Sequence, residues 1–310
     1  MIVVFGSINV DLLFGVNELP QAGETVLCAD YGKAAGGKGL NQAVAAARAK
    51  PVSTLPVHMV GCAGNDQFGD VALDALATAG VDISGVTRSS SPTACAAVLV
   101  DRMGENQIVV ASGANNTLAA EALPDAWLGT DTVLVLQMEV PLQSNCEVIK
   151  RAKRRGARVV LNLAPAGPFP EELIPALDLL ILNELEASTV ASHNGLKVTS
   201  GQAAAKAIAS HYSVTTVVSL GAAGACAFAS NEEWKIGVLP ITPIDTVGAG
   251  DAFVGGLAVG LVLDLSLPEM LLRASVGAGL SCQSEGAAKS MPTAAKIESQ
   301  LEDLLPARRL

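Results

Sequence analysis

The sequence predicts an α/β protein built around a mostly parallel β-sheet. From about residue 132 onward, short apolar runs alternate with segments of helical length, which is the pattern of successive βαβ units. Half of the residues are hydrophobic, but only 3% are aromatic. Alanine, valine, leucine and isoleucine must therefore fill the core, as in parallel sheets that are buried on both faces. A chain of 310 residues is long enough for one large domain.

Apolar runs, and the glycine, proline and capping residues between them, define the expected elements. In the first third we expect a strand at 2–5, a hairpin at 18–33, a helix at 41–50, a strand at 58–64, a helix at 66–79, and strands at 93–100 and 107–110. Later strands are expected at 132–137, 157–164, 178–183, 214–221, 224–230 and 233–238, and helices at 141–155, 184–192, 201–212, 248–263 and 268–282. This order predicts a single domain over 1–310, with small lid strands from about 12–35 and 93–111.

Charge and composition exclude several classes of protein. The net charge of −10 and the pI near 4.8 argue against a nucleic-acid surface, which needs clustered lysine and arginine. The longest apolar run, 252–263, is too short to cross a membrane, and the N-terminus lacks the basic region of a signal peptide. The six cysteines are scattered, without a CxxC pair, which indicates reduced thiols and a cytoplasmic protein.

The stretch GKAAGGKG at 32–39 is one residue away from a Walker A phosphate loop. That motif continues from its lysine to a serine or threonine whose hydroxyl binds magnesium, but here the position holds Gly39. The glycines still permit a close backbone approach at the start of a helix. The loop is therefore a poor candidate for the nucleotide site.

The stretch DTVGAGDAF at 245–253 is a better candidate, because a long apolar helix follows it directly. Gly248, Ala249 and Gly250 place small residues and free N–H groups at the helix start, where the helix dipole favours an anion. Asp251 lies in the first turn, beside that anion site, and could accept a proton. An ordinary N-cap with an acidic first turn fits the same residues, so this stretch alone leaves both interpretations open.

DTVGAGDAF resembles the signature of the ribokinase-like carbohydrate kinases, Asp-Thr-x-Gly-Ala-Gly-Asp-x-Phe. Other matching stretches occur in the order of that family: GSINVDL at 6–12, GGKGLNQA at 36–43, GCAGNDQFG at 61–69, SGAN at 112–115, NELEA at 183–187, SLGAAG at 219–224 and GAAKSMP at 286–292. The resemblance therefore covers nearly the whole chain. It implies a three-layer α/β sandwich with a mostly parallel central sheet and a small β-sheet lid. It also implies an enzyme that transfers the γ-phosphoryl group of ATP to a sugar hydroxyl.

In that family, the residue at Asp251 is the base that takes the proton of the attacking hydroxyl. The amides of Gly248, Ala249 and Gly250 form the anion hole for the transferring group. This division suits phosphoryl transfer, which depends on in-line positioning and charge stabilisation.

The resemblance also implies the nucleotide and magnesium site. Asn183 and Glu186 organise the magnesium ion near the phosphates, largely through water, although the same pair fits an N-cap with its capping-box partner. The nucleotide is expected to contact Ser219, Gly221, Gly224 and Gly250.

For the sugar, the resemblance implies contacts with Asn9, Asp11, Gly37, Lys38, Asn41 and Glu139, together with Asp251. Asn9 and Asp11 are two residues apart, so they project to one side of an extended segment, although each also fits a turn. Glu139 follows a strand expected to be buried, at the carboxyl end where open α/β sheets bind ligands.

A monovalent-cation site is implied as well, for K⁺ as an activator, at Asp245, the carbonyl of Val247, Ser281, Ser284, Gly286 and Ser290. Ser284 and Glu285 differ from the basic or bulkier residues of many relatives, which leaves the contact at that point open. Exposed edges of the lid strands predict a homodimer.

Two other classes of protein fit the sequence less well than a carbohydrate kinase. A dinucleotide-binding oxidoreductase lacks its motif, because SINVD follows Gly6 in place of GxGxxG. A non-catalytic sugar-binding protein is expected to lose Asp251 or the small residues before it, and neither is lost. Within the family that the chain resembles, the set Asn9, Asp11, Lys38, Asn41 and Glu139 is most similar to that of enzymes that phosphorylate the 5-hydroxyl of D-ribose, so this hydroxyl is the expected acceptor. Fructose, 2-keto-3-deoxygluconate and adenosine are the alternatives.

Overall fold

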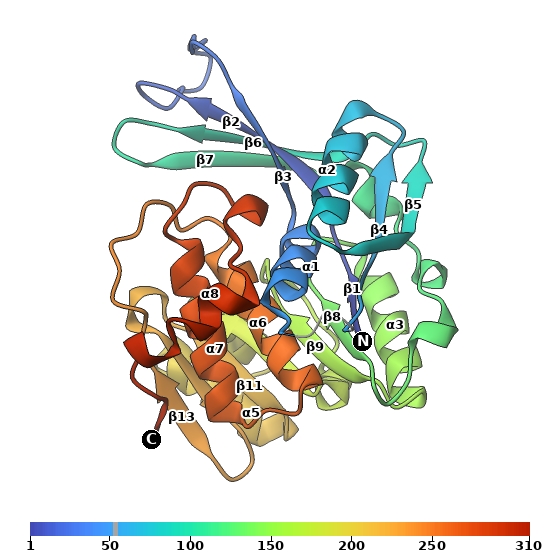
Figure 1. Ribbon diagram of the computed structural model, residues 1–310, viewed down its shortest axis with the longest axis vertical. Coiled ribbons are helices and arrows are strands. Elements are labelled where there is room, and N and C mark those ends of the chain that lie inside the picture. Colours follow the sequence, from blue (N-terminus) through green and yellow to red (C-terminus); the bar gives the residue numbers. More distant parts are fainter. Residues whose placement is uncertain (52–54) are drawn as a thin grey trace.

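A ten-stranded β-sheet forms the centre of the molecule (Figure 1). The structure is a computed structural model, and it describes residues 1–51 and 55–310. The strand order is β14-β13-β12-β11-β10-β9-β8-β1-β4-β5. The parallel strands are β1 Ile2–Phe5, β4 Val57–Gly64, β5 Asp82–Ser89, β8 Val133–Leu136, β9 Arg158–Asn162, β10 Leu179–Asn183 and β11 Thr215–Ser219. The antiparallel strands are β12 Ala225–Phe228, β13 Glu233–Ile236 and β14 Arg308–Arg309.

Helices cover both faces of this sheet, which confirms the predicted three-layer sandwich. One layer contains α1 Lys38–Ala49, α2 Gln67–Thr78, α6 Ala249–Val262, α7 Leu267–Ser281 and the short α8 Ala294–Glu298. The other contains α3 Leu142–Arg154, α4 Glu184–His193 and α5 Gly201–Tyr212. Alternate residues of β1 serve the two layers: Ile2 and Val4 pack on the first side, and Val3 and Phe5 on the second. Short 3-10 helices occupy Gly113–Thr117, Ala120–Ala122, Asp125–Trp127, Glu171–Ala176, Gly221–Ala223, Ala288–Ser290 and Leu301–Asp303.

A separate four-stranded sheet projects from one end of the molecule (Figure 1). It has the order β3-β2-β6-β7, with β2 Asn9–Gly15, β3 Gly32–Gly36, β6 Ala94–Val100 and β7 Asn106–Ala111. We call it the small sheet. The hairpin expected at 18–33 was misplaced: its strands are β2 and β3, and the residues between them form a long connection. Glycine and proline in that connection were correct turn signals, but β2 begins earlier than its apolar pattern suggested.

Two edge strands were missed by the sequence analysis. β5 pairs with β4 at one edge of the main sheet, and β14 pairs with β13 at the other. In β5 only one of the eight residues is buried, and its sequence, DISGVTRS, has few apolar residues. Such a strand gives no periodic signal, because backbone pairing and not side-chain burial holds it in place.

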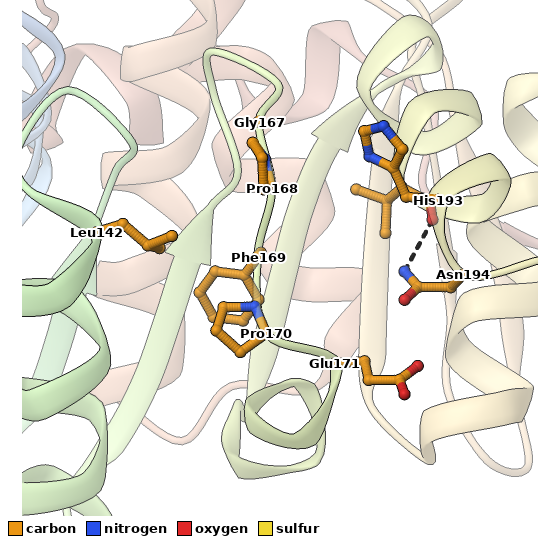
Figure 2. Close-up of a pocket in the computed structure, with 9 residues that line it drawn as sticks. Leu142, Gly167, Pro168, Phe169, Pro170, Glu171, His193 and Asn194 are labelled. Atoms are coloured by element: carbon orange, nitrogen blue, oxygen red, sulfur yellow. Dashed lines mark hydrogen bonds between the residues drawn. The ribbon is translucent and has the colours of Figure 1, made fainter.

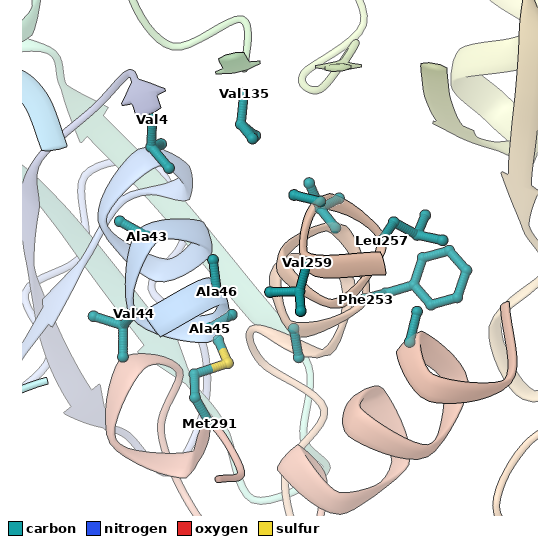
Figure 3. Packing of buried hydrophobic residues seen from close by; sticks show 14 of the residues in the cluster. Val4, Ala43, Val44, Ala45, Ala46, Val135, Phe253, Leu257, Val259 and Met291 are labelled. Atoms are coloured by element: carbon teal, nitrogen blue, oxygen red, sulfur yellow. The ribbon is translucent and has the colours of Figure 1, made fainter. Parts of the chain in front are cut away.

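Helices α1 and α6 pack closely, and their contact determines the geometry of the site (Figure 3). Alanines of α1 face Gly255 on α6. A Cβ added at Gly255 would lie 2.5 Å from the Ala45 Cβ and 2.9 Å from the Ala46 nitrogen. Larger residues would force these helices apart.

Within the described part of the chain, no helix is long and apolar enough to cross a membrane.

Candidate active site

Helix α6 begins at the glycine-rich motif, as predicted. Gly248 is the N-cap, with φ of 80°, and Asp251 lies in the first turn. Among the described residues, no acceptor is recorded for the N–H groups of Gly248 and Gly250, so both are free to bind an anion. The N–H of Ala249 instead donates to the Thr246 carbonyl at 3.2 Å. The three amides predicted to act together are therefore not equivalent in this structure.

The Asp251 carboxylate is held by two amide side chains from α1. Asn41 Nδ2 donates to Asp251 Oδ2 at 2.9 Å, and Gln42 Nε2 donates to Asp251 Oδ1, also at 2.9 Å. The packing of α1 on α6 explains this contact. Asn41 precedes Ala45 by one helical turn, as Asp251 precedes Gly255, so both pairs lie along the same line of helix contact.

Burial raises the pKa of Asp251, whose side chain is almost inaccessible to solvent. The positive charge of Lys38 and the hydrogen bonds from Asn41 and Gln42 lower the pKa in part, whereas the negative charge of Glu139 raises it further. A carboxylate whose pKa is raised is a stronger base than one in water.

Glu139 lies beside the start of α1, just beyond the end of β8. Its Oε2 accepts a hydrogen bond from the Ser7 hydroxyl at 2.6 Å and another from the Lys38 backbone N–H at 3.0 Å. Ser7 Oγ in turn accepts from the Gly39 N–H at 3.1 Å. These bonds fix the carboxylate against the β1–β2 connection, so a ligand meets a prearranged acceptor.

Asn9 and Asp11 lie on β2, as the extended spacing predicted. Asn115 Nδ2 donates to Asn9 Oδ1 at 2.7 Å, and Asn115 Oδ1 accepts from the Ile8 N–H. Burial, then the charges of Glu139 and Asp251, raise the pKa of Asp11 to about 6. The Asp11 carboxyl group is therefore within electrostatic reach of both Glu139 and Asp251.

Gly37, the N-cap of α1, has φ of 89°, and an added Cβ would lie 3.0 Å from the Asn9 side chain and backbone. Only glycine combines this backbone conformation with this approach. Gly37 thus lets the start of α1 lie directly against Asn9.

A cavity of about 170 Å³ lies against Asp251. Gly248, Gly250 and the Lys38 side chain line it, together with Asn183 and Glu186. Lys38 was expected among the sugar ligands. In the structure its side chain faces this cavity, while its backbone N–H serves Glu139.

Asn183 and Glu186 form the capping box of α4, the structural alternative that the sequence left open. Asn183 Oδ1 accepts from the Glu186 N–H, and Glu186 Oε2 accepts from the Asn183 N–H, both at 2.8 Å. Burial raises the pKa of Glu186, while the Asn183 bond and the Lys38 charge lower it in part. Since both side chains also line the cavity, capping does not exclude a second role.

A larger cavity of about 480 Å³ adjoins the first, and the two share Ser219, Gly250 and Phe253. Gly221 and Gly224 line one wall, and residues of α7 line another. The surface is mostly apolar, as suits a planar base. The predicted nucleotide residues Ser219, Gly221, Gly224 and Gly250 therefore all border one continuous cleft.

The predicted cation residues are brought together only in part. Asp245 Oδ1 accepts from the Val247 N–H at 2.9 Å, and Asp245 Oδ2 accepts from the Gly286 N–H at 2.8 Å. The hydroxyls of Ser281 and Ser290 donate to the carbonyls of Ala278 and Ala287, and Ser284 is exposed. Asp245 thus joins the two loops, whereas the serines are engaged locally.

A third cavity, of about 440 Å³, lies in the layer of α3 and α4 (Figure 2). Phe169, Pro170 and Leu142 give it a mostly apolar wall, and its carboxylate, Glu171, accepts a hydrogen bond from the Tyr212 hydroxyl at 3.2 Å. It shares no lining residue with the cleft at α6. Its composition does not suit a phosphate group.

Several residues that support the site were missed by the sequence analysis: Ser7, Gln42, Asn115, Gln137 and Asn162. Ser7, Gln42 and Asn115 stand within stretches that matched the family motifs, and Gln42 directly follows Asn41, which was expected to contact the sugar. Gln137 and Asn162 were detectable only as polar residues at the ends of two apolar strands. Their contacts span 95 and 120 residues, which no local pattern reveals.

A buried carboxylate at a helix N-terminus, beside polar side chains and a mostly apolar cleft, is typical of a phosphotransferase that acts on an alcohol group. A family model for pfkB family carbohydrate kinases matches residues 1–294. The chain therefore belongs to the pfkB family of carbohydrate kinases.

Known relatives agree. The chain is 33% identical over 304 residues to a ribokinase of Lactococcus lactis, with 97% of each chain covered. It is 35% identical over 305 residues to a ribokinase of Bacillus subtilis, covering 97% of this chain and 99% of the other. Among solved structures, the ribokinase of Thermotoga maritima gives a TM-score of 0.89 at 30% identity, covering 97% and 99%. The Arabidopsis thaliana ribokinase complexed with ribose and ATP gives 0.84 at 30% identity, covering 97% and 98%.

Proposed function

We propose that this enzyme phosphorylates the 5-hydroxyl of D-ribose with ATP. The observation that carries the proposal is the position of Asp251. Its carboxylate accepts a hydrogen bond from Asn41, one of the proposed sugar contacts, and it also borders the smaller cavity. The similarity over nearly the full length of several ribokinases, one of them bound to ribose and ATP, supports the choice of substrates.

Asp251 accepts the proton of the attacking hydroxyl in this proposal. The free amides of Gly248 and Gly250, and the Lys38 side chain, stabilise the negative charge of the transferring phosphoryl group. Ala249 contributes its amide once its bond to Thr246 opens. The base of ATP lies in the larger cavity, against Ser219, Gly221 and Gly224.

The sugar lies among Asn9, Asp11, Gly37, Asn41 and Glu139. The Asn41 Oδ1 atom is buried and has no hydrogen-bond partner among the described residues. An unsatisfied buried acceptor costs free energy, and a sugar hydroxyl that donates to it removes that cost.

Magnesium would be held near the phosphates by Asn183 and Glu186, largely through water, and it would neutralise phosphate charge. Within the described ranges no three His, Cys, Asp or Glu side chains converge as metal ligands, so phosphate oxygens and water must complete the coordination. A potassium ion would bind at the loops that Asp245 joins, with the Val247 carbonyl and oxygens of Ser281, Ser284, Gly286 and Ser290.

The small sheet acts as a lid over the sugar in this proposal, and it pairs with a second copy of the chain in the cytoplasm. All six residues of the edge strand β7 are exposed, among them Ile108, Val109 and Val110. Such an edge pairs readily with another strand. Light scattering at micromolar concentration tests the dimer. A monomeric mass would contradict it, and Val110→Lys should lower the mass of a dimer to that of one chain.

A coupled ADP-release assay tests the substrate. Ribose should give the highest kcat/KM among ribose, deoxyribose, fructose, 2-keto-3-deoxygluconate and adenosine, and turnover should require Mg²⁺ and rise with K⁺ relative to Na⁺. If another acceptor were used and ribose were not, the substrate would be wrong while the kinase activity stood.

Asp251→Asn tests the base. Turnover should fall by at least about 10³-fold, since general-base catalysis contributes about 10²–10⁴-fold and the charge is lost as well. Sugar binding measured by calorimetry should change far less. The matched control, Asp303→Asn, alters an exposed carboxylate outside the site and should be fully active. Retained activity in Asp251→Asn would exclude this residue as the base.

A further inference from the structure

We propose that Gln42 is the positioning residue for the base: its side-chain amide fixes Asp251 Oδ1, so that Oδ2 faces the acceptor hydroxyl. The inference rests on the proposed role of Asp251. Gln42 does not touch substrate in this proposal and acts only through the carboxylate.

The hydrogen bonds of Gln42 leave its amide one orientation. A carboxylate only accepts, so Gln42 Nε2 must face Asp251. Its second hydrogen goes to Asn162 Oδ1 at 3.1 Å, and Gln42 Oε1 accepts from Gln137 Nε2 at 2.8 Å. Both donor hydrogens and the carbonyl oxygen are thus used, and flipping the amide would break all three contacts.

The partners of Gln42 belong to the rigid centre of the fold. Asn162 ends β9, and Gln137 directly follows β8, the neighbouring parallel strand. Gln137 is fully buried, and Asn145 Nδ2 from α3 donates to the backbone carbonyl of Gln137 at 2.7 Å. Gly6 leaves room for it: a Cβ there would lie 1.9 Å from Gln137 Oε1. The position of the base is therefore tied to two central strands.

Asn41 differs from Gln42 in this respect. It also donates to Asp251, but its Oδ1 has no hydrogen-bond partner in the described part of the chain, and Asn41 is one of the proposed sugar contacts. Asn41 can form a new hydrogen bond when a sugar binds, whereas every polar atom of the Gln42 amide is already hydrogen-bonded within the protein. Gln42 therefore holds the carboxylate throughout the reaction cycle.

Charged groups surround Asp251, so the hydrogen bond from Gln42 also affects whether its carboxyl group is ionised. Lys38 from α1 faces it with a positive charge, whereas Glu139 after β8, Asp11 on β2 and Glu186 on α4 bring negative charge to the same region. A donor aimed at Oδ1 favours the ionised form, which is the form that accepts a proton.

The test compares Gln42→Met and Gln42→Glu by the pH dependence of kcat and by sugar KM. Gln42→Met keeps the length and removes the donors. It should lower kcat at pH 7 at least tenfold and move the acidic limb upward by about one to two pH units, with KM changed less than about threefold. Gln42→Glu should move the limb further, because a second carboxylate faces the first. Gln143→Met, at an exposed position on α3, is the control and should match the parent.

Three outcomes would overturn the proposal: an unchanged acidic limb, an equal pH-independent loss in both variants, or a rise in KM with unchanged kcat. Circular dichroism and thermal unfolding establish that each variant folds. If Gln42→Met does not fold, Gln137→Met is used in its place. It removes the hydrogen bond to Gln42 Oε1 and should move the acidic limb of the pH profile in the same direction by a smaller amount. Activity in Asp251→Asn would refute the base itself, a result separate from any obtained with Gln42.

Discussion

Replacing Asp11 by asparagine is expected to stabilise the fold while weakening the site. Asp11 lies on β2, and its carboxylate is partly buried near Glu139 and Asp251. Burial and the two like charges all raise the pKa of Asp11. The ionised side chain therefore destabilises the folded state, and the proposed contact with the sugar would account for its presence.

The size of the effect follows from the pKa. A rise from 3.8 to about 6 corresponds to roughly 3 kcal/mol, at about 1.4 kcal/mol per unit. Because the side chain keeps some contact with water, we expect about 1–2 kcal/mol in practice. The folded-state pKa is the higher one, so the stability from this group is fully present below about pH 4, is lost as the pH rises through about 6, and stays lost above.

Urea unfolding of the parent and Asp11→Asn at pH 5 and pH 8 measures this. The variant should exceed the parent by about 1–2 kcal/mol at pH 8 and by clearly less at pH 5. Ribose affinity should fall by about tenfold or more, since hydrogen bonds to charged groups contribute about 1.5–3 kcal/mol. Asp74→Asn, on the exposed surface of α2, is the control and should show no pH-dependent gain. An equal or lower stability of Asp11→Asn at pH 8 would refute the reasoning.

Three further changes test the geometry. Gly250→Ala places a Cβ where no atom lies within 4 Å, so thermal stability should persist, but the methyl group enters the expected phosphate site and kcat should fall at least tenfold in the ADP-release assay. Gly255→Ala should destabilise the fold by about 1–3 kcal/mol in urea and lower kcat, since the Ala45 methyl lies 2.5 Å away; an unchanged kcat would show that α1 and α6 need not touch so closely. Ser7→Ala removes the 2.6 Å bond to Glu139 and should raise ribose KM several-fold with less effect on kcat.

Local sequence patterns were sufficient to predict most of the main sheet. The alternation of apolar runs and helices identified the parallel strands from β8 to β11, because each is buried on both faces and reads as an apolar run. It failed at β5, whose side chains are mostly exposed, and it misplaced the hairpin, since β2 carries polar site residues in place of an alternating pattern. Function itself disturbed the signal at β2.

The motif residues could be singled out from the sequence, but the residues that hold them in place could not. Asp251, Asn41 and Gly248 stand in stretches whose residue types state a chemical purpose. Gln42 stands beside Asn41 in one of those stretches, yet its role depends on Asn162 and Gln137, which only the folded sheet brings near. A glutamine within a helix has many ordinary explanations, and the three contacts that distinguish this one are all distant in sequence.

The small residues between α1 and α6 explain why the two halves of the site meet. In the proposed mechanism, residues of α1 contact the sugar and the start of α6 contacts the transferring phosphoryl group, so the reaction requires that these helices approach closely. Ala45 and Gly255 allow this approach, and one turn before each lie Asn41 and Asp251, 2.9 Å apart through Nδ2 and Oδ2. A leucine at either position would separate the helices by the thickness of a side chain and break that bond. The apolar packing of this pair of helices is thus part of the proposed catalytic geometry, because it determines the distance between Asp251, the proposed base, and Asn41, a proposed sugar contact.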